Sequence, residues 1–220
     1  MSNKEKRIIM SAAGVAVCGI SVGLFKHAAL GVDPFQSLMS GLDAVIPIHF
    51  GTLYVIVNVI LLGFSLLLDR SKIGLATVIN LLFLGYIAEY SQKLFEHLFP
   101  EPSLLLRFIL LLAAVVIMCI ASSFYFTADL GVSTYDAVTL IWSERQKKIP
   151  FSVCRIIGDL TCVLLGIILC LTAGFSIGQI LEVVGIGTII TAFFMGPLIA
   201  LFNRKVAEPF LYGLKREQDL

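Results

Sequence analysis

The residues best placed to do chemistry are polar and ionisable side chains that lie within long apolar segments. Asp159 follows Arg155 by four positions, so a helix would place both side chains on one face and allow an ion pair. Charges inside a membrane helix are costly and commonly mark ion or substrate pathways, although a paired charge can also be purely structural. Asn58, in an earlier apolar segment, is a polar group that could approach the same depth. Asp159 is therefore either a binding residue or one half of a structural pair.

Two short motifs place polar groups at the predicted start of a helix. Asp33 and Pro34 suit the N-cap and the first helical position, and Gln36 could reach back to the cap. Ser133 and Asp136 repeat this pattern as a hydroxyl cap and an acidic third residue. The free amides of a helix start can bind an anion. The acidic groups here favour a cation, a proton or an amine instead.

The predicted substrate-binding residues are the polar and charged side chains of these motifs and segments. They are Asp33, Gln36, Asn58, Asn80, Ser133, Asp136, Arg155 and Asp159. For Asn80, joining two helices is the commoner role of a polar side chain in a membrane, and lining a pocket is the alternative.

Motifs of known catalytic or metal sites are missing from the sequence. The five cysteines form no C-x-x-C pair, and the three histidines lack the four-residue spacing of a zinc site. Residues Gly19–Gly23 match the nucleophile pattern G-x-S-x-G, but they lie inside an apolar run, which favours close helix packing. We therefore expect no enzyme activity, no catalytic residue, no metal and no cofactor.

The amino-acid composition indicates which kind of protein must position these residues. Of the 220 residues, 58% are hydrophobic and 14% are charged, whereas soluble domains average about 25% charged residues. A soluble domain of this size could not hide so much apolar surface. The net charge of +1 argues against a nucleic-acid partner. The chain is predicted to be an all-α integral membrane protein.

Six segments are apolar over the roughly 20 residues that a membrane helix needs. They are Ile8–Leu30, Phe50–Leu68, Ile73–Tyr90, Phe108–Phe126, Ser152–Ala173 and Val183–Phe202. Two shorter helices, Pro34–Ile46 and Thr134–Gln146, are too short to span. Each short helix either lies flat at the membrane interface, which is the commoner case, or re-enters the membrane with its start facing a cavity.

Basic residues set the predicted orientation. With both termini in the cytoplasm, 13 of the 16 Lys and Arg residues lie inside: Lys4, Lys6, Arg7, Arg70, Lys72, Arg145, Lys147, Lys148, Arg155, Arg204, Lys205, Lys215 and Arg216. Only Lys26, Lys93 and Arg107 lie outside. Cytoplasmic loops are enriched in Lys and Arg, so this orientation is preferred.

The two halves of the chain resemble each other in sequence. Leu30–Leu38 aligns with Leu130–Val138, and Gly74–Asn80 aligns with Gly185–Thr191, with an insertion predicted in the loop around Gly174–Glu182. Each half contains three spans and one short helix, and because three is odd the two halves are inverted in the membrane.

The predicted organisation is a first repeat at 1–103, a second repeat at 104–205 and a cytoplasmic tail at 206–220. Inverted repeats are a common plan of secondary transporters.

The repeated motifs carry a resemblance to a known family. Gly31–Phe35, Gly131–Asp136, Gly74–Thr77 and Gly185–Thr188 are similar to motifs of the YczE/YitT-type family of bacterial multi-pass membrane proteins. The first motif departs from the family pattern, because it has Gln36 where the second has an acidic residue. The resemblance implies a bacterial plasma-membrane protein with transport as the usual assignment, and it implies no substrate, reaction or cofactor.

These observations predict a secondary transporter or permease for a small molecule or ion, with its site between the inverted repeats. The alternative is a membrane accessory or scaffold that does not transport, or the substrate-binding subunit of a larger transporter. The expected partners are the lipid bilayer and an unknown small molecule or ion, and a homo-oligomer or an accessory membrane partner is compatible with either function.

Overall fold

The regular structure consists of helices. The structure is a computed structural model that describes residues 3–146 and 151–213, and within these residues no strand occurs. Four of the predicted cytoplasmic basic residues, Lys147, Lys148, Lys215 and Arg216, lie outside the described residues.

Among the described segments, five are long and apolar enough to cross a membrane: Lys4–Ala28, Phe50–Leu68, Leu104–Ala128, Val153–Thr172 and Ile177–Tyr212. Large apolar side chains are exposed on their outer faces, such as Leu67 at 86% and Leu105 at 72%. Apolar surface of this extent suits contact with a lipid bilayer. These features indicate a helical membrane protein.

The long helices are α1 (Asn3–Ala28), α3 (Phe50–Leu68), α4 (Leu75–Leu98), α5 (Leu104–Ala128), α7 (Phe151–Thr172) and α9 (Ile186–Phe202). The short helices α2 (Pro34–Val45) and α6 (Thr134–Gln146) follow α1 and α5. The predicted bounds of α3 and α6 are confirmed to the residue. α4 is not among the five apolar segments, although its 24 residues are long enough to span.

The predicted loop at the insertion contains a helix, so that prediction was wrong. α8 (Ile177–Val183) begins after Ser176, whose hydroxyl accepts a hydrogen bond from the backbone of Gln179 at 3.4 Å. The Gln179 side chain accepts one in return from the backbone N–H of Ser176 at 2.9 Å. This reciprocal capping stabilises a helix that is too short to be recognised from hydropathy.

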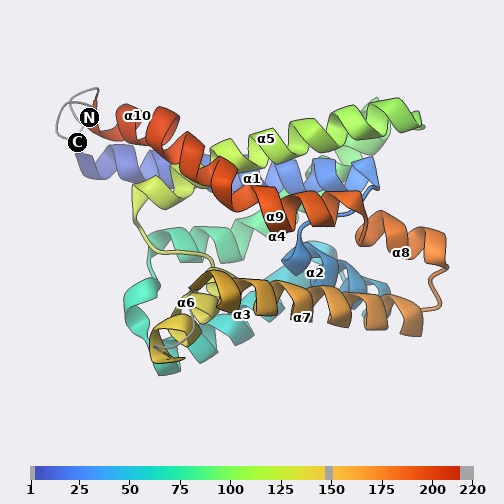
Figure 1. Ribbon diagram of the computed structural model, residues 1–220, viewed down its shortest axis with the longest axis horizontal. Helices are drawn as coiled ribbons and strands as arrows, with labels where there is room; N and C mark the ends of the chain where they lie inside the picture. The colour runs from blue at the N-terminus through green and yellow to red at the C-terminus, as the bar shows by residue number, and fades with distance from the viewer. Residues whose placement is uncertain (1–2, 147–150, 214–220) are drawn as a thin grey trace.

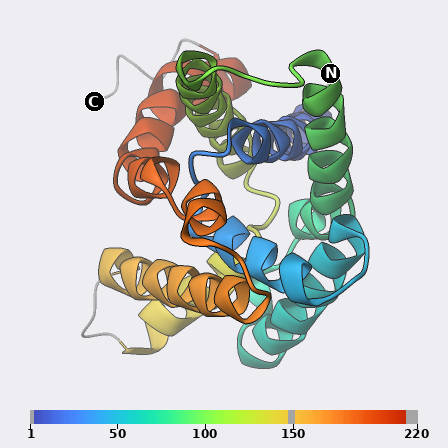
Figure 2. The ribbon, with the colours of Figure 1, turned by 90° about the vertical axis from the view of Figure 1, so that its right-hand side faces the viewer.

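The long and short helices form two groups. α1, α4, α5 and α9 pack together in one group, and α2, α3, α6 and α7 form the other (Figure 1). The view along the bundle separates the same two groups (Figure 2). Each group takes two helices from the first half of the chain and two from the second, so neither half forms a separate body.

Close packing of α1 on α4 explains the G-x-S-x-G pattern. A Cβ atom at Gly19 would lie 2.8 Å from the Ile87 side chain, and one at Gly23 would lie 2.7 Å from the backbone nitrogen of Gln92. Between them, Ser21 donates a hydrogen bond to the carbonyl of Ala114 at 2.7 Å, on α5. The predicted packing role is confirmed, since small residues let neighbouring backbones approach.

Two glycine turns connect the halves of the chain in the same way. Gly31 and Gly131 have φ of +102° and +103°, a conformation that favours glycine. After α1, the backbone N–H of Val32 donates to the carbonyl of Val183 at 3.0 Å, just before α9.

The second turn repeats this bond after α5. There the backbone N–H of Val132 donates to the carbonyl of Lys72 at 3.2 Å, just before α4. Each short helix is thus tied to the other half of the chain.

The last described helix packs on the first. Arg7 donates hydrogen bonds to the Ala128 carbonyl at 2.9 Å and to the hydroxyl of Tyr212 at 3.0 Å, in α10 (Glu208–Tyr212). Leu211 is buried beside Met10. α1 therefore begins and α10 ends at the same end of the bundle (Figure 1).

Candidate functional site

A cavity of about 490 Å³ lies between the two groups of helices, and residues of α1 to α7 and of α9 line it. All eight side chains that the sequence predicts as substrate-binding line this cavity: Asp33, Gln36, Asn58, Asn80, Ser133, Asp136, Arg155 and Asp159. Its volume falls within the range of about 300–1,000 Å³ that is usual for small-molecule sites.

The largest cluster of charges in the cavity is centred on Arg155. Its guanidinium donates a hydrogen bond to the carboxylate of Asp136 on α6, and its Nε lies 3.3 Å from Asp159 Oδ1, one turn further along α7. Asp159 also accepts a hydrogen bond from the hydroxyl of Tyr135 at 2.6 Å. The predicted pair of Arg155 and Asp159 is confirmed, and Asp136 extends it to a cluster that joins α6 to α7.

The cap of α6 has the predicted form and holds Asp136 in place. Ser133 Oγ accepts a hydrogen bond from the backbone N–H of Asp136 at 3.1 Å and donates one to its carboxylate at 2.7 Å. The Asp136 carboxylate is therefore satisfied by Ser133 on one oxygen and by Arg155 on the other. These bonds fix its orientation towards α7.

The cap of α2 differs from its counterpart in α6. Asp33 accepts a hydrogen bond from the backbone N–H of Gln36 at 3.2 Å, which confirms the N-cap. The Gln36 side chain does not reach back as predicted: its Oε1 is buried and has no hydrogen-bond partner within the described part of the chain. Among the same residues, no basic nitrogen lies within 4.0 Å of the Asp33 carboxylate.

Asn58 and Asn80 connect helices at the wall of the cavity. Thr134, at the start of α6, donates a hydrogen bond to Asn58 Oδ1, and Asn58 Nδ2 donates to the backbone carbonyl of Tyr54 at 2.8 Å. The Tyr54 hydroxyl donates to Asn80 Oδ1 at 3.2 Å, which joins α3 to α4. Both asparagines thus join helices and line the cavity as well.

The aromatic residues of the site were not predicted. Phe35 stacks on Tyr135 with ring centroids 5.0 Å apart and meets Tyr54 edge-on at 6.1 Å. The guanidinium of Arg155 lies over the Tyr135 ring, 4.8 Å from its centroid. The repeat alignment could have identified two of these rings, because Phe35 and Tyr135 occupy matching positions after the glycine turns.

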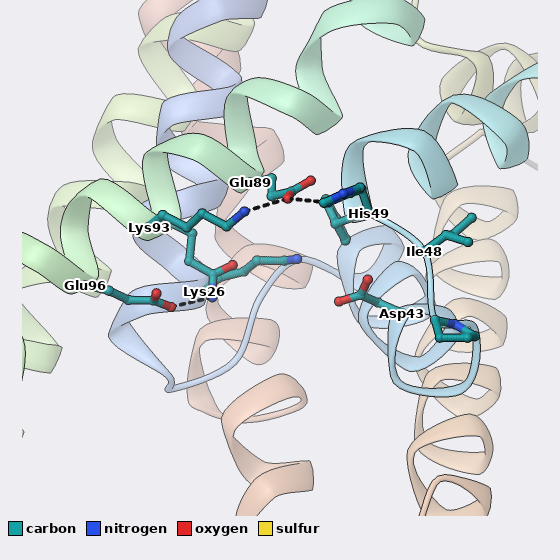
Figure 3. A pocket seen from close by; sticks show the side chains of 10 residues that line it. Lys26, Asp43, Ile48, His49, Glu89, Lys93 and Glu96 are labelled. Carbon is teal, nitrogen blue, oxygen red and sulfur yellow. Dashed lines mark hydrogen bonds and ion pairs between the residues drawn. The ribbon is translucent and has the colours of Figure 1, made fainter.

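A second pocket, of about 480 Å³, lies at the end of α2 (Figure 3). Lys93 donates a hydrogen bond to Glu89 at 2.8 Å, and Glu89 also lies 3.3 Å from His49 Nδ1. The hydrogen bond to Glu89 raises the pKa of Lys93, which lies beyond the end of the predicted span. Lys26 Nζ lies 3.1 Å from the centroid of the Phe50 ring.

This second pocket lies one helical turn from the central cavity. Phe50 lines the second pocket, Tyr54 lines the cavity, and their ring centroids are 6.3 Å apart on α3. The two spaces are therefore neighbours separated by aromatic side chains.

Comparison with known proteins places the chain among relatives of unassigned activity. "Uncharacterized protein YyaS" of Bacillus subtilis (strain 168) is 26% identical over 204 residues, which cover 92% of this chain and 95% of the relative. An uncharacterized protein of Haemophilus influenzae is 24% identical over 203 residues, with coverage of 92% and 85%. No solved structure matches the chain. Residues 5–204 match the model of DUF6198, a family of unknown function, and the chain belongs to that family.

Proposed function

We propose that this protein is a secondary transporter or permease of the bacterial plasma membrane, and that its central cavity binds a small molecule or an ion. One observation carries the proposal: charged side chains line a cavity at the interface between two groups of membrane-type helices. Polar and ionisable groups inside a membrane protein are expensive and are mostly kept for a pathway or a binding site. The resemblance of the repeated motifs to the YczE/YitT-type family, which implies transport as the usual assignment, is part of this proposal.

The two short helices support a re-entrant arrangement. The first residues of α2, from Pro34 to Ser37, are buried, and residues at the starts of both α2 and α6 line the cavity. A helix lying flat on the membrane surface would keep one side exposed to water. Discontinuous helices whose ends meet at the middle of the membrane are typical of secondary transporters.

The proposed topology has six spans, with α4 as the third, and two inverted repeats. The paired bonds at the Gly31 and Gly131 turns support the repeat, because each joins equivalent positions of the two halves. The helix ends agree with two termini on one side of the membrane, which the basic residues of the sequence predict to be the cytoplasmic side. α1 and α10 share one end of the bundle with Arg7, while Lys26 and Lys93 line the pocket at the end of α2.

The test is flux through the purified protein in liposomes. Concentration jumps of sodium chloride, butylammonium chloride, sodium butyrate and amino acids are applied, and current or uptake is compared with protein-free liposomes. We expect flux of at least one compound class, which Asp136→Asn and Asp159→Asn reduce at least tenfold. Asp129→Asn makes the same chemical change at an exposed position with φ of +52°, which asparagine adopts readily, so it should keep the wild-type rate.

Two results would contradict this function. One is the absence of flux for every compound class, accompanied by a membrane protein that co-purifies in a fixed ratio; this result would favour the accessory alternative. The other is flux that both cavity variants leave unchanged, which would place the pathway elsewhere.

A further inference from the structure

The ionisable groups of the central cavity carry a net negative charge. Asp33, Asp136 and Asp159 line it, and Arg155 is the basic residue among the described side chains of its wall. The guanidinium pairs with two of the three carboxylates. Within the described ranges the Asp33 carboxylate has no basic partner, and because it lines the cavity a bound molecule can reach it.

A buried polar atom next to Asp33 also lacks a partner. Gln36 is 4% exposed, lines the same cavity and has no hydrogen-bond partner for its Oε1 within the described residues. A buried acceptor without a donor costs free energy, so native proteins seldom keep one without a ligand or water to satisfy it. Asp33 and Gln36 are the N-cap and third residue of one helix and both line the cavity, so a ligand with several donors that binds Asp33 could reach Gln36 Oε1 once the Gln36 side chain rotates towards the cavity.

The remaining wall is apolar and aromatic. Phe35 and Tyr54 lie beside Asp33 on α2 and α3, and Met118 and Met195 face the cavity from α5 and α9. Aromatic faces attract organic cations, and thioether side chains adapt to alkyl groups. This lining suits a ligand with an apolar body and a positively charged end.

We propose that the central cavity binds a small organic cation that carries N–H donors, of the primary alkylammonium class, between the Asp33 carboxylate and Gln36 Oε1. The inference rests on the proposed function and names its substrate class. An ammonium group satisfies both acceptors at once, while its alkyl group lies against Phe35 and Tyr54. A quaternary ammonium supplies the charge and no donor, and a carboxylate supplies neither.

The geometry argues against two other ligand classes. An anion would meet the carboxylates of Asp33 and Asp136 at the starts of α2 and α6. Side-chain oxygens already accept from the helix amides there, Asp33 from the N–H of Gln36 and Ser133 Oγ from the N–H of Asp136. A metal ion would need a compact set of ligands, and the described residues contain no group of three or more His, Cys, Asp or Glu side chains that could hold one.

The experiment measures binding by titration calorimetry of the purified full-length protein in detergent at neutral pH. The probes are butylammonium, tetramethylammonium, butyrate, butanol and sodium ions. We expect butylammonium to bind at least tenfold more tightly than each of the others. Asp33→Asn should weaken its binding by about 10-fold to 100-fold, the range for one charged hydrogen bond.

The control variants separate binding from folding. Asparagine is as good an N-cap as aspartate, so Asp33→Asn should keep α2 intact. Gln36→Leu should also weaken butylammonium binding. Asp129→Asn, at its exposed turn, should leave the affinity unchanged.

The inference is overturned if butyrate or sodium binds more tightly than butylammonium, or if Asp33→Asn leaves butylammonium binding unchanged. Failure of the proposed function has a different outcome. Butylammonium that binds through Asp33 but produces no flux in liposomes would leave a cation-binding protein that does not transport. Flux of butyrate or sodium with no butylammonium binding would leave a transporter with another substrate class.

Discussion

The contact between α2 and α7 is predicted to be so close that a single methyl group would separate the helices. A Cβ atom at Gly166 on α7 would lie 2.6 Å from the backbone oxygen of Ser37 and 3.1 Å from the backbone nitrogen of Leu38. These are backbone atoms of α2 and cannot rotate away. Gly166→Ala therefore requires the helices to move apart.

The expected loss of stability follows from comparison with a glycine whose Cβ position is free of neighbours. A Cβ atom at Gly63 on α3 meets nothing within 4 Å. Both substitutions gain about 0.5–1 kcal/mol of helix stability from alanine. Gly166→Ala also loses about 1–3 kcal/mol of stability because the added methyl group overpacks the contact. The two variants should therefore differ by about 1–3 kcal/mol, which corresponds to roughly 2–12 °C in melting temperature for a chain of this size.

The assay uses the native cysteines. All five are buried, so a maleimide dye that fluoresces on reaction reports their exposure as the protein unfolds. Gly166→Ala should melt below Gly63→Ala and should bind butylammonium more weakly, because α2 carries Asp33. Equal melting temperatures for the two variants would refute the close approach of α2 and α7.

Two further predictions concern the charge cluster and the membrane orientation. Arg155→Met leaves the partly buried carboxylate of Asp136 without its basic partner, so the variant should lose about 3 kcal/mol of stability; an unchanged melting temperature would contradict the stabilising role of the ion pair. Ser71→Cys and Pro100→Cys place exposed thiols at opposite faces of the proposed topology. In intact cells an impermeant maleimide should label the second and spare the first until the membrane is opened, and the reverse pattern would invert the orientation.

The sequence predicted the helices where hydropathy and capping agree. The bounds of α3 follow from an apolar run that ends at Asp69, and those of α6 follow from the Ser133 cap. α4 continues to Leu98, past the predicted end at Tyr90, because a helix can extend beyond the apolar run with charged residues such as Lys93. Hydropathy measures only the part of a helix that suits lipid.

The residues that line the cavity could be predicted from the sequence, but the ion pairs and hydrogen bonds between them could not. Ionisable residues in apolar segments avoid lipid and turn inward, which brings Asp33, Asp136 and Asp159 to one space. The choice of Asp136 as a partner of Arg155 depends on how α6 lies against α7. That arrangement is a tertiary property and leaves no periodic signal in the sequence. The position of the Gln36 side chain is also a tertiary property. It does not form the predicted bond to the helix cap and is buried at the cavity wall instead.

The two glycine turns restrict the way in which the cavity could open. The turn at Gly31 bonds to the chain before α9, and the turn at Gly131 bonds to the chain before α4. If one repeat rocked against the other, both sets of backbone hydrogen bonds would break, at about 0.5–1.5 kcal/mol for each bond even where water replaces it.

Movement of one four-helix group against the other does not require the hydrogen bonds of the turns to break. The turns are held by α4 and α9, which belong to one group, while α2 and α6 leave the turns to enter the other group. A movement of one group against the other could therefore keep the turn bonds while it changes the distance between helices across the cavity. If the protein works by alternating access as proposed, movement of the two mixed groups keeps the turn bonds that movement of the two sequence repeats would break, and it acts on the contact between α3 and α4, where Tyr54 bonds to Asn80.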